Sequence, residues 1–179
     1  LLAVVLLLFA GWSTYYGVVI WKVNKQVGMA SYILTRSMSE PLNPRQRMAI
    51  VREALYLLEE SEGNNFQSAE IDNLKGTAYL LTGRSREAVR SFKDALKTAP
   101  SPESYVNLAT AYLSLGNREE AVESLRKAQN YDIRNLKVLQ FMWHMWRNGG
   151  FSSEDSIQLV LRLKGDGVIG SPRALRMLR

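Results

Sequence analysis

The chain has 179 residues but no cysteine and a single histidine, His144. Without cysteine it can form neither a disulfide nor a thiolate metal site, and it holds no Cys/His pair for nucleophilic catalysis. His144 lies among tryptophans and methionines in residues 141–146, a pattern that favours packing or an interface over general base catalysis. We therefore expect no enzyme, no cofactor and no metal site.

Long runs of like charge are also missing, although the formal net charge is +6. Residues 126–179 carry 10 basic and 4 acidic side chains, a net charge of +6 for that segment alone. A solvated mixed surface, an acidic protein and anionic lipid all stay open as explanations of that charge. Residues 165–170 are rich in glycine but lack the GxGxxG spacing, so we interpret them as a turn or loop. Neither nucleic acid nor a small-molecule substrate is expected as a partner.

Charge is absent altogether from residues 1–21, which are mostly aliphatic or aromatic. Twenty-one helical residues span about 31 Å, close to the hydrocarbon thickness of a bilayer. Trp21 and Lys22 stand at the end of the segment, as an aromatic and a charged anchor would. The segment predicts a single transmembrane helix over 1–21, with the lipid bilayer as a partner. A signal peptide and a buried helix are the alternatives.

Small residues gather inside this segment, at Gly11, Ser13, Thr14 and Gly17. Small side chains let two membrane helices approach closely, and hydroxyl groups can form hydrogen bonds across the contact. The pattern favours a helix–helix contact through these four residues, although glycine and serine are common in membrane spans in any case.

Basic residues follow the segment at Lys22, Lys25 and Arg36, and none precedes them. The positive-inside rule then places the rest of the chain in the cytoplasm. Basic residues upstream of Leu1 would reverse this assignment, so a periplasmic or other extracytoplasmic location stays open.

Residues 22–43 are predicted to continue the helix and then to enter a short stiff linker, because Pro41 and Pro44 forbid an unbroken helix over residues 38–44. Asn43-Pro44 is typical of a helix start, with proline in the first turn. We expect a flanking helix within residues 44–68 that ends near Glu60. Its buried side is expected to hold the apolar residues Ile50, Ala54, Leu55, Leu57 and Leu58.

The strongest signal in the chain is an internal repeat. The segment that begins at Thr77 recurs 33 residues later at Thr110, and 10 of 19 aligned positions are identical between 77–95 and 110–128. A period of this length is typical of stacked supersecondary units, which build binding surfaces rather than reaction centres.

The repeat resembles the tetratricopeptide-repeat family, whose unit is a pair of helices of about 34 residues. In the first copy the matching residues are Gly76, Tyr79, Gly83, Ala88, Phe92, Ala95 and Pro100, of which Ala88, Phe92 and Ala95 are expected on the buried face of the second helix. In the second copy they are Tyr105, Leu108, Ala109, Tyr112, Gly116, Ala121, Leu125 and Ala128. The resemblance implies an all-α helical solenoid with repeats over 69–101 and 102–135. Together with the uncharged N-terminal segment, it predicts an all-α protein in which a transmembrane helix precedes the solenoid.

Residues 136–179 are interpreted as a divergent repeat and C-terminal cap. Trp143 stands where the family has a small residue, and the second copy lacks the closing proline. Terminal units of a solenoid commonly differ from internal ones, because one of their faces meets water. The aromatic and methionine cluster at 141–146 is a candidate for a sticky surface, with a core or capping role as the alternative.

The resemblance also implies a partner-binding groove, because the first helix of each unit lines the concave face in this family. The corresponding positions, with one more from the carboxylate clamp of chaperone-binding relatives, are Glu70, Asn73, Thr77, Leu80, Glu103, Val106, Asn107, Thr110 and Leu113. Their mixed polar and apolar character suits an extended peptide or a helix. Asn73 and Thr77 replace the Lys and Asn of that clamp in the first unit, which argues against a chaperone co-factor.

These features predict a non-enzymatic scaffold or assembly subunit of a membrane protein complex. It would bind protein subunits through the solenoid and the transmembrane helix, and anchoring would raise the effective concentration of one partner near another. Two alternatives stay open. One is an anchored chaperone-like accessory that binds transient clients in export or folding, and the other is a regulatory subunit of a membrane enzyme.

Overall fold

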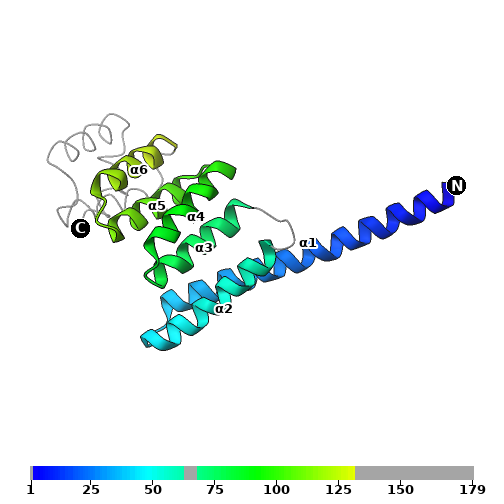
Figure 1. Ribbon diagram of the computed structural model, residues 1–179, viewed down its shortest axis with the longest axis horizontal. Coiled ribbons are helices and arrows are strands. Elements are labelled where there is room, and N and C mark those ends of the chain that lie inside the picture. Colours follow the sequence, from blue (N-terminus) through cyan, green and yellow to red (C-terminus); the bar gives the residue numbers. More distant parts are fainter. Residues whose placement is uncertain (1, 63–67, 132–179) are drawn as a thin grey trace, which may run out of the picture. The chain divides into compact units, whose positions relative to one another are not determined.

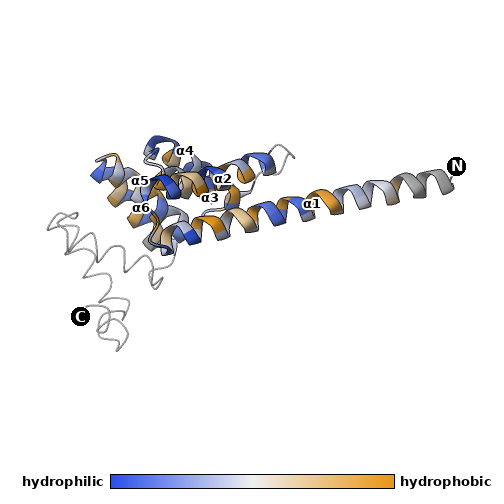
Figure 2. Ribbon diagram, turned by 90° about the horizontal axis from the view of Figure 1, so that it is seen from below, coloured by the Kyte–Doolittle hydropathy of each residue, from blue (hydrophilic) through white to orange (hydrophobic). Residues whose placement is uncertain are grey.

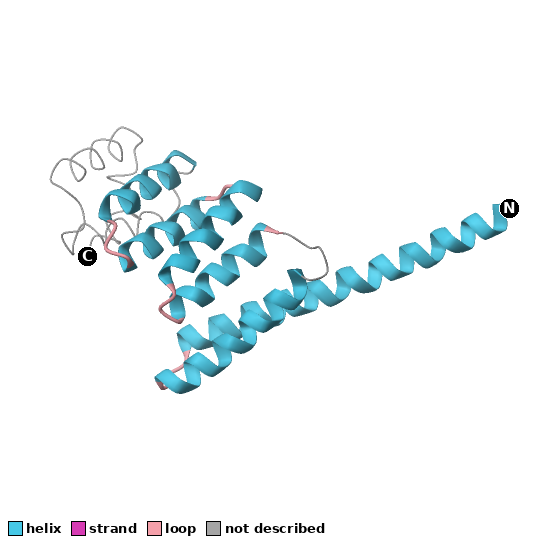
Figure 3. Cartoon of the chain, viewed as in Figure 1, coloured by secondary structure: helices cyan, strands magenta, loops and turns pink. Residues whose placement is uncertain are grey.

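The computed structural model describes residues 2–62 and 68–131, and every regular element in them is an α-helix (Figure 3). Six helices follow one another in these residues and are labelled in Figure 1. They divide between two compact units, whose boundary lies between Ser91 and Phe92 inside the fourth helix. The prediction of an all-α fold is confirmed.

The first unit is built on one long helix, α1, which runs without a break over Leu2–Ser39. Its 38 residues span about 57 Å, and its N-terminal half extends past the end of the next helix, α2 (Pro44–Glu62; Figure 1). Coloured by hydropathy, α1 is pale over the coloured turns nearest its N-terminal end, and orange and blue turns alternate where it comes to lie beside α2 (Figure 2). The predicted continuation of the helix beyond Lys22 is confirmed.

The C-terminal half of α1 belongs to a hydrophobic core, and its interpretation as a juxtamembrane segment leading into a linker missed this. Its buried apolar residues recur every three or four positions, at Val23, Val27, Ala30, Ile33 and Leu34. They share one core with Val51, Ala54, Leu55 and Leu58 of α2 and with Ile71 and Ala78 of α3 (Ala69–Leu81). The first unit is therefore a packed set of helices that includes residues from α1, and only the stretch from Glu40 to Asn43 connects α1 to α2.

The helix α2 begins at Pro44, as the Asn43-Pro44 pair predicts. The backbone N–H of Gln46 donates to Oδ1 of Asn43 at 2.9 Å, and the N–H of Asn43 donates to Oε1 of Gln46 at 3.1 Å. This reciprocal capping pair satisfies backbone donors that the first turn leaves unpaired. The five residues expected on the buried side divide into buried Ala54, Leu55 and Leu58 and half-buried Ile50 and Leu57.

Polar contacts fix the position of α1 against α2 at both ends of their interface. At one end, Nζ of Lys22 lies 2.7 Å from Oε1 of Glu60. At the other, Nε of Arg47 donates to the carbonyl oxygen of Ser37 at 3.2 Å. Because the two contacts lie at opposite ends of the helix pair, a register slip of either helix would break both.

The helices α3 and α4 (Ser85–Thr98) form the first repeated pair. Ser68 caps α3 by accepting a hydrogen bond from the N–H of Ile71 at 3.2 Å. Gly83 turns the chain after α3 with a φ of 75°, a conformation that costs glycine little. The residues of α4 that the repeat predicts to be buried are fully buried: Ala88, Phe92 and Ala95.

The helices α5 (Pro102–Ser114) and α6 (Arg118–Tyr131) form the second pair, which has the same serine cap and glycine turn as the first. Ser101 caps α5 by accepting from the N–H of Ser104 at 3.1 Å, and Gly116 turns the chain with a φ of 80°. The core of this pair consists of Ala109, Ala121, Leu125 and Ala128. The 33-residue repeat therefore corresponds to two similar helix pairs, as predicted.

Two further predictions concern the ends of the chain. The divergent repeat over 136–179, with His144 and the segments 141–146 and 165–170, lies outside the described residues. At the other end, the described residues form no helix with the length and hydropathy that crossing a bilayer requires. The transmembrane helix over 1–21 stays a prediction.

Candidate protein-interaction surfaces

The first candidate surface is the face of α3 that carries Glu70, Asn73, Thr77 and Leu80. Their spacing of three and four residues puts them on one side of the helix. Glu70 is exposed and the other three are half-buried. The hydroxyl of Thr77 donates to the carbonyl oxygen of Asn73 at 2.9 Å. This hydrogen bond uses the hydroxyl proton, so Thr77 offers a partner an oxygen acceptor and a methyl group.

The second candidate surface is the equivalent face of α5. Its predicted residues are all half-buried: Glu103, Val106, Asn107, Thr110 and Leu113. Thr110 repeats the contact of Thr77, because its hydroxyl donates to the carbonyl oxygen of Val106 at 3.0 Å. Glu70 and Glu103 also occupy equivalent first turns, where a carboxylate favours the N-terminal end of the helix dipole. Each face therefore combines one carboxylate with apolar and acceptor groups, which suits a partner segment that carries basic and apolar side chains.

A groove that joins these two faces is a prediction that the structure does not test. The residues on α3 belong to the first unit and those on α5 belong to the second unit. Each set lies on one face of its own helix.

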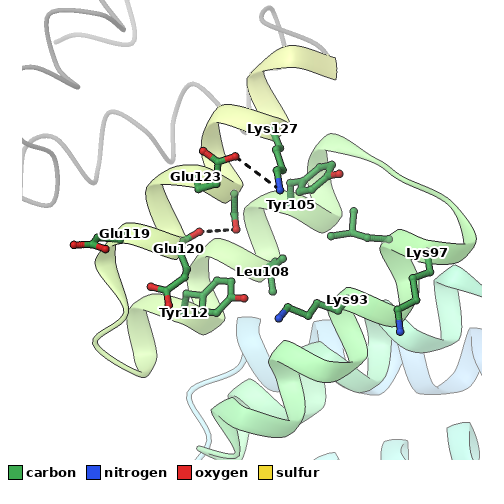
Figure 4. Close-up of a pocket in the computed structure, with 11 residues that line it drawn as sticks. Lys93, Lys97, Tyr105, Leu108, Tyr112, Glu119, Glu120, Glu123 and Lys127 are labelled. Carbon is green, nitrogen blue, oxygen red and sulfur yellow. Dashed lines mark hydrogen bonds and ion pairs between the residues drawn. The ribbon is translucent and has the colours of Figure 1, made fainter.

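A third surface lies wholly within the second unit and was not predicted. It is a groove of about 730 Å³ between the end of α4 and the length of α6, with α5 as its floor (Figure 4). Lys93, Leu96 and Lys97 line it from α4, and Tyr105, Leu108 and Tyr112 line it from α5. The lining from α6 consists of Glu119, Glu120, Glu123, Ser124 and Lys127.

The aromatic floor of this groove interacts with its charged rim. Nζ of Lys93 lies 5.6 Å from the centre of the Tyr112 ring, within reach of a cation–π contact. The rings of Tyr105 and Tyr131 are 5.6 Å apart between their centres. Burial raises the pKa of Tyr105, and the nearby hydroxyl of Tyr131 adds to the rise. A tyrosine of ordinary or raised pKa is neutral at physiological pH, so Tyr105 adds no charge to the floor of the groove.

The fourth surface is the N-terminal half of α1. Five large apolar side chains on it are between 63% and 72% exposed: Phe9, Trp12, Tyr15, Val18 and Trp21. The small residues that were predicted to contact another membrane helix are exposed as well: Gly11, Ser13, Thr14 and Gly17. Among the described residues, no atom lies within 4 Å of a Cβ added at Gly11 or Gly17. The contact that these small residues are predicted to make is therefore available, and it stays a prediction.

Clusters of metal-binding side chains are absent from the part of the chain that the structure describes. There, no three or more His, Cys, Asp or Glu side chains come close enough together to hold a metal ion. The acidic residues of the groove in the second unit are spread along α6 rather than gathered around one point (Figure 4).

Comparison with known proteins identifies the repeated helix pairs. Residues 69–102 and 102–132 each match the family model of the tetratricopeptide repeat. Each match spans one helix pair, α3 with α4 and α5 with α6.

A solved structure shares this fold. It is the crystal structure of a thermophilic tetratricopeptide-repeat protein from Thermus thermophilus, at a TM-score of 0.62 and 22% sequence identity. The similarity covers 69% of this chain and 64% of that protein, so this chain spans less than two thirds of that protein's length. At this identity the likeness concerns the fold alone. No curated protein matches the chain.

The groove in the second unit was not predicted because it lies away from the ligand positions of the tetratricopeptide-repeat family. The family's ligand positions on the first helix of a repeat predict the face of α5 with Val106 and Thr110. Tyr105, Leu108 and Tyr112 lie on the opposite side of α5, since 100° per residue separates the two sets by roughly 150°. A signal was nevertheless present, because α4 ends with two lysines four residues apart and α6 begins with clustered glutamates.

Proposed function

We propose that this protein is a membrane-anchored scaffold of a protein complex. In this proposal, residues 1–21 insert into a bilayer and the tetratricopeptide repeats hold a protein subunit close to it. The proposal rests on two separate features of the chain, the repeats and the exposed half of α1.

The repeats support the protein-binding part of the proposal. Stacked helix pairs present extended surfaces to other proteins, and tetratricopeptide repeats are interaction scaffolds. The equivalent faces of α3 and α5 offer the same order of side chains twice, with a first-turn glutamate followed by a threonine two turns later. A partner segment with basic and apolar residues at that spacing would suit either face.

The single observation that carries the membrane part is the distribution of exposed apolar residues around α1. At 100° per residue, Trp21, Val18, Tyr15, Trp12, Phe9 and Ile20 follow one another over about 260° of the helix circumference. A partner helix covers only a stripe of about 100°. Lipid surrounds a helix on all sides, so a bilayer would cover this surface more completely than one protein helix would.

The arrangement of α1 indicates how such an anchor would act. The helix continues without a break from the apolar segment into the core of the first unit. An anchored helix of this kind would fix the distance and direction of the first unit from the bilayer, which a flexible linker would not do. A partner bound to the repeats would then be held at high effective concentration near membrane subunits.

The side of the membrane is part of the proposal too. Lys22 and Lys25 directly follow the apolar segment, and by the positive-inside rule they favour a cytoplasmic location for the repeats. The chain contains no cysteine, so a single cysteine placed at exposed Tyr56 can be labelled without background. Protection of that cysteine from an impermeant maleimide in intact cells is expected for a cytoplasmic domain. Labelling in intact cells would place the domain on the other side.

Membrane attachment is tested by alkaline carbonate extraction of membranes that contain the full chain. We expect the wild-type chain to stay in the membrane pellet and a Phe9→Lys/Val18→Lys variant to be released. Tyr32→Lys is the matched control, because Tyr32 is an exposed aromatic residue of α1 outside the apolar segment. Release of the wild-type chain by carbonate would contradict the anchor.

Scaffolding is tested by mild-detergent extraction, size-exclusion chromatography and mass spectrometry of the co-eluting chains. A partner at fixed stoichiometry is expected, and it should be lost in a Glu70→Arg/Glu103→Arg variant. The control is Glu53→Arg/Glu59→Arg, which reverses two exposed charges on α2. Elution alone, or with many substoichiometric clients, would contradict the scaffold and favour a chaperone-like accessory.

A further inference from the structure

The groove in the second unit has the features of a docking surface in its own right. Its floor is Tyr105, Leu108 and Tyr112, of which Leu108 is buried and the two tyrosines are half-buried. From the first to the last of these residues the floor extends about 10 Å along α5, since each helical residue rises 1.5 Å. That length equals two turns of a helix laid along it.

The two sides of the groove carry opposite charge. Lys93 and Lys97 extend from α4 on one side, and Glu119, Glu120 and Glu123 extend from α6 on the other (Figure 4). Lys127 also lines the α6 side, where three glutamates against one lysine leave the wall acidic. All six side chains are exposed at the rim, while the floor between them is apolar. A partner segment that enters the groove therefore meets a basic wall, an apolar floor and an acidic wall in that order.

Two ion pairs at the rim are each local to one wall. Nζ of Lys97 lies 2.6 Å from Oδ1 of Asp94 within α4, and Nζ of Lys127 lies 3.8 Å from Oε1 of Glu123 within α6. Exposed pairs of this kind contribute little and exchange readily with other partners. The charges of both walls can therefore interact with an incoming segment.

We propose that this groove docks an amphipathic helix of a partner protein, with acidic residues along the flank over α4 and basic residues along the flank over α6. Its apolar residues, at i, i+3, i+4 and i+7, would contact Tyr105, Leu108 and Tyr112. Charge complementarity on both flanks selects this partner, because a segment with one sign of charge would be repelled by one wall. The inference goes beyond the function proposed above, since it uses the other side of α5 and does not require a membrane.

The probes for this proposal are two designed helical peptides with the same apolar stripe. The first, the mixed peptide, carries Glu on one flank and Lys on the other, and the second, the basic peptide, carries Lys on both flanks. Exchanging the two flanks of the mixed peptide is no control, because a helix turned end for end presents them to the opposite walls. Binding to the full chain in detergent micelles is measured by fluorescence anisotropy.

The wild-type protein is expected to bind the mixed peptide about tenfold more tightly than the basic peptide. A Lys93→Glu/Lys97→Glu variant has two acidic walls, so its preference should invert. A milder Lys93→Gln/Lys97→Gln variant should lose the preference, and it guards against misfolding of the first variant. Arg86→Glu/Arg90→Glu changes the net charge equally at exposed positions of α4 outside the groove and should keep the wild-type preference.

Three results would overturn the proposal. The first is equal affinity of both peptides for the wild-type protein. The second is a preference that the lysine variants leave unchanged. The third is self-association of the protein alone, measured by sedimentation, that the Lys93→Glu/Lys97→Glu variant abolishes. That outcome would assign the groove to a second copy of this chain.

Discussion

The ammonium group of Lys75 lies between the two carboxylate oxygens of Glu62, at 2.8 Å from Oε1 and 2.7 Å from Oε2. This pair joins the last residue of α2 to the middle of α3. The Lys75 side chain is only 16% exposed, so solvent screens the pair less than it screens the other ion pairs of the first unit. It is therefore the salt bridge with the best prospect of a measurable effect on stability.

The pair makes stability depend on alkaline pH. Burial is the largest single influence on Lys75 and lowers its pKa, but the hydrogen bond and charge of Glu62 together outweigh it, and the pKa is raised above 10.5. A raised lysine pKa stabilises the fold fully below 10.5, and that stabilisation is lost as pH rises through the folded-state pKa. We expect Lys75→Met to cost about 1 kcal/mol at pH 8, and the gap to wild type to close at higher pH. Urea unfolding of both proteins from pH 8 upward measures this gap, and a gap that stays constant with pH would contradict the assignment.

Two substitutions two residues apart in α1 should have opposite effects. Gly28 is exposed, and no described atom lies within 4 Å of an added Cβ, so Gly28→Ala should stabilise the helix by about 0.5–1 kcal/mol. Ala30 is fully buried in the core with α2 and α3, so Ala30→Leu should destabilise by about 1–3 kcal/mol through overpacking. Thermal unfolding of the two variants measures both effects. If Ala30→Leu is neutral, this half of α1 is not part of the core.

The two glycines that follow α3 and α5 should be equally sensitive to substitution by a residue with a Cβ. Gly83 and Gly116 have φ values of 75° and 80°, which strain any residue with a Cβ. Space is not the cause, because the surroundings of both glycines are open among the described residues. Replacement by Ala should cost about 1–2 kcal/mol at either site, and replacement by Asn should cost less. Urea unfolding of the four single variants tests this, and a harmless Gly83→Ala would contradict the left-handed turn.

Two leucines of the second repeat should differ in their effect on stability, because one is buried and the other is exposed. Leu125 is 0% exposed in the core of α5 and α6, whereas Leu115 at the end of α5 is 37% exposed. Leu125→Ala should lower the free energy of unfolding by about 2–5 kcal/mol. Leu115→Ala should change it by about 0.5 kcal/mol or less. Equal losses at the two sites, measured by chemical denaturation, would show that α6 packs in another register.

The repeat unit could be predicted in detail because its signal is local. Tyr79 and Tyr112, with the glycines four residues after them, recur at one period, and the apolar residues of each second helix recur at three and four positions. Such spacing fixes which side of a helix is apolar, and close packing then buries that side. For this reason Ala88, Phe92 and Ala95 could be assigned to the core from their places in the tetratricopeptide pattern.

The sequence by itself determined the helical repeats, their turns and the uncharged N-terminal segment, because each depends on neighbours within one or two helical turns. The tertiary structure alone decided that residues 23–34 of α1 pack into the first unit, since an apolar stripe has the same spacing whether it faces protein or lipid. The tertiary structure also decided which residues form the groove over α5. Lys93 and Glu119 lie 26 positions apart in the chain, and only the folding of α4, α5 and α6 together places them on opposite walls of one surface.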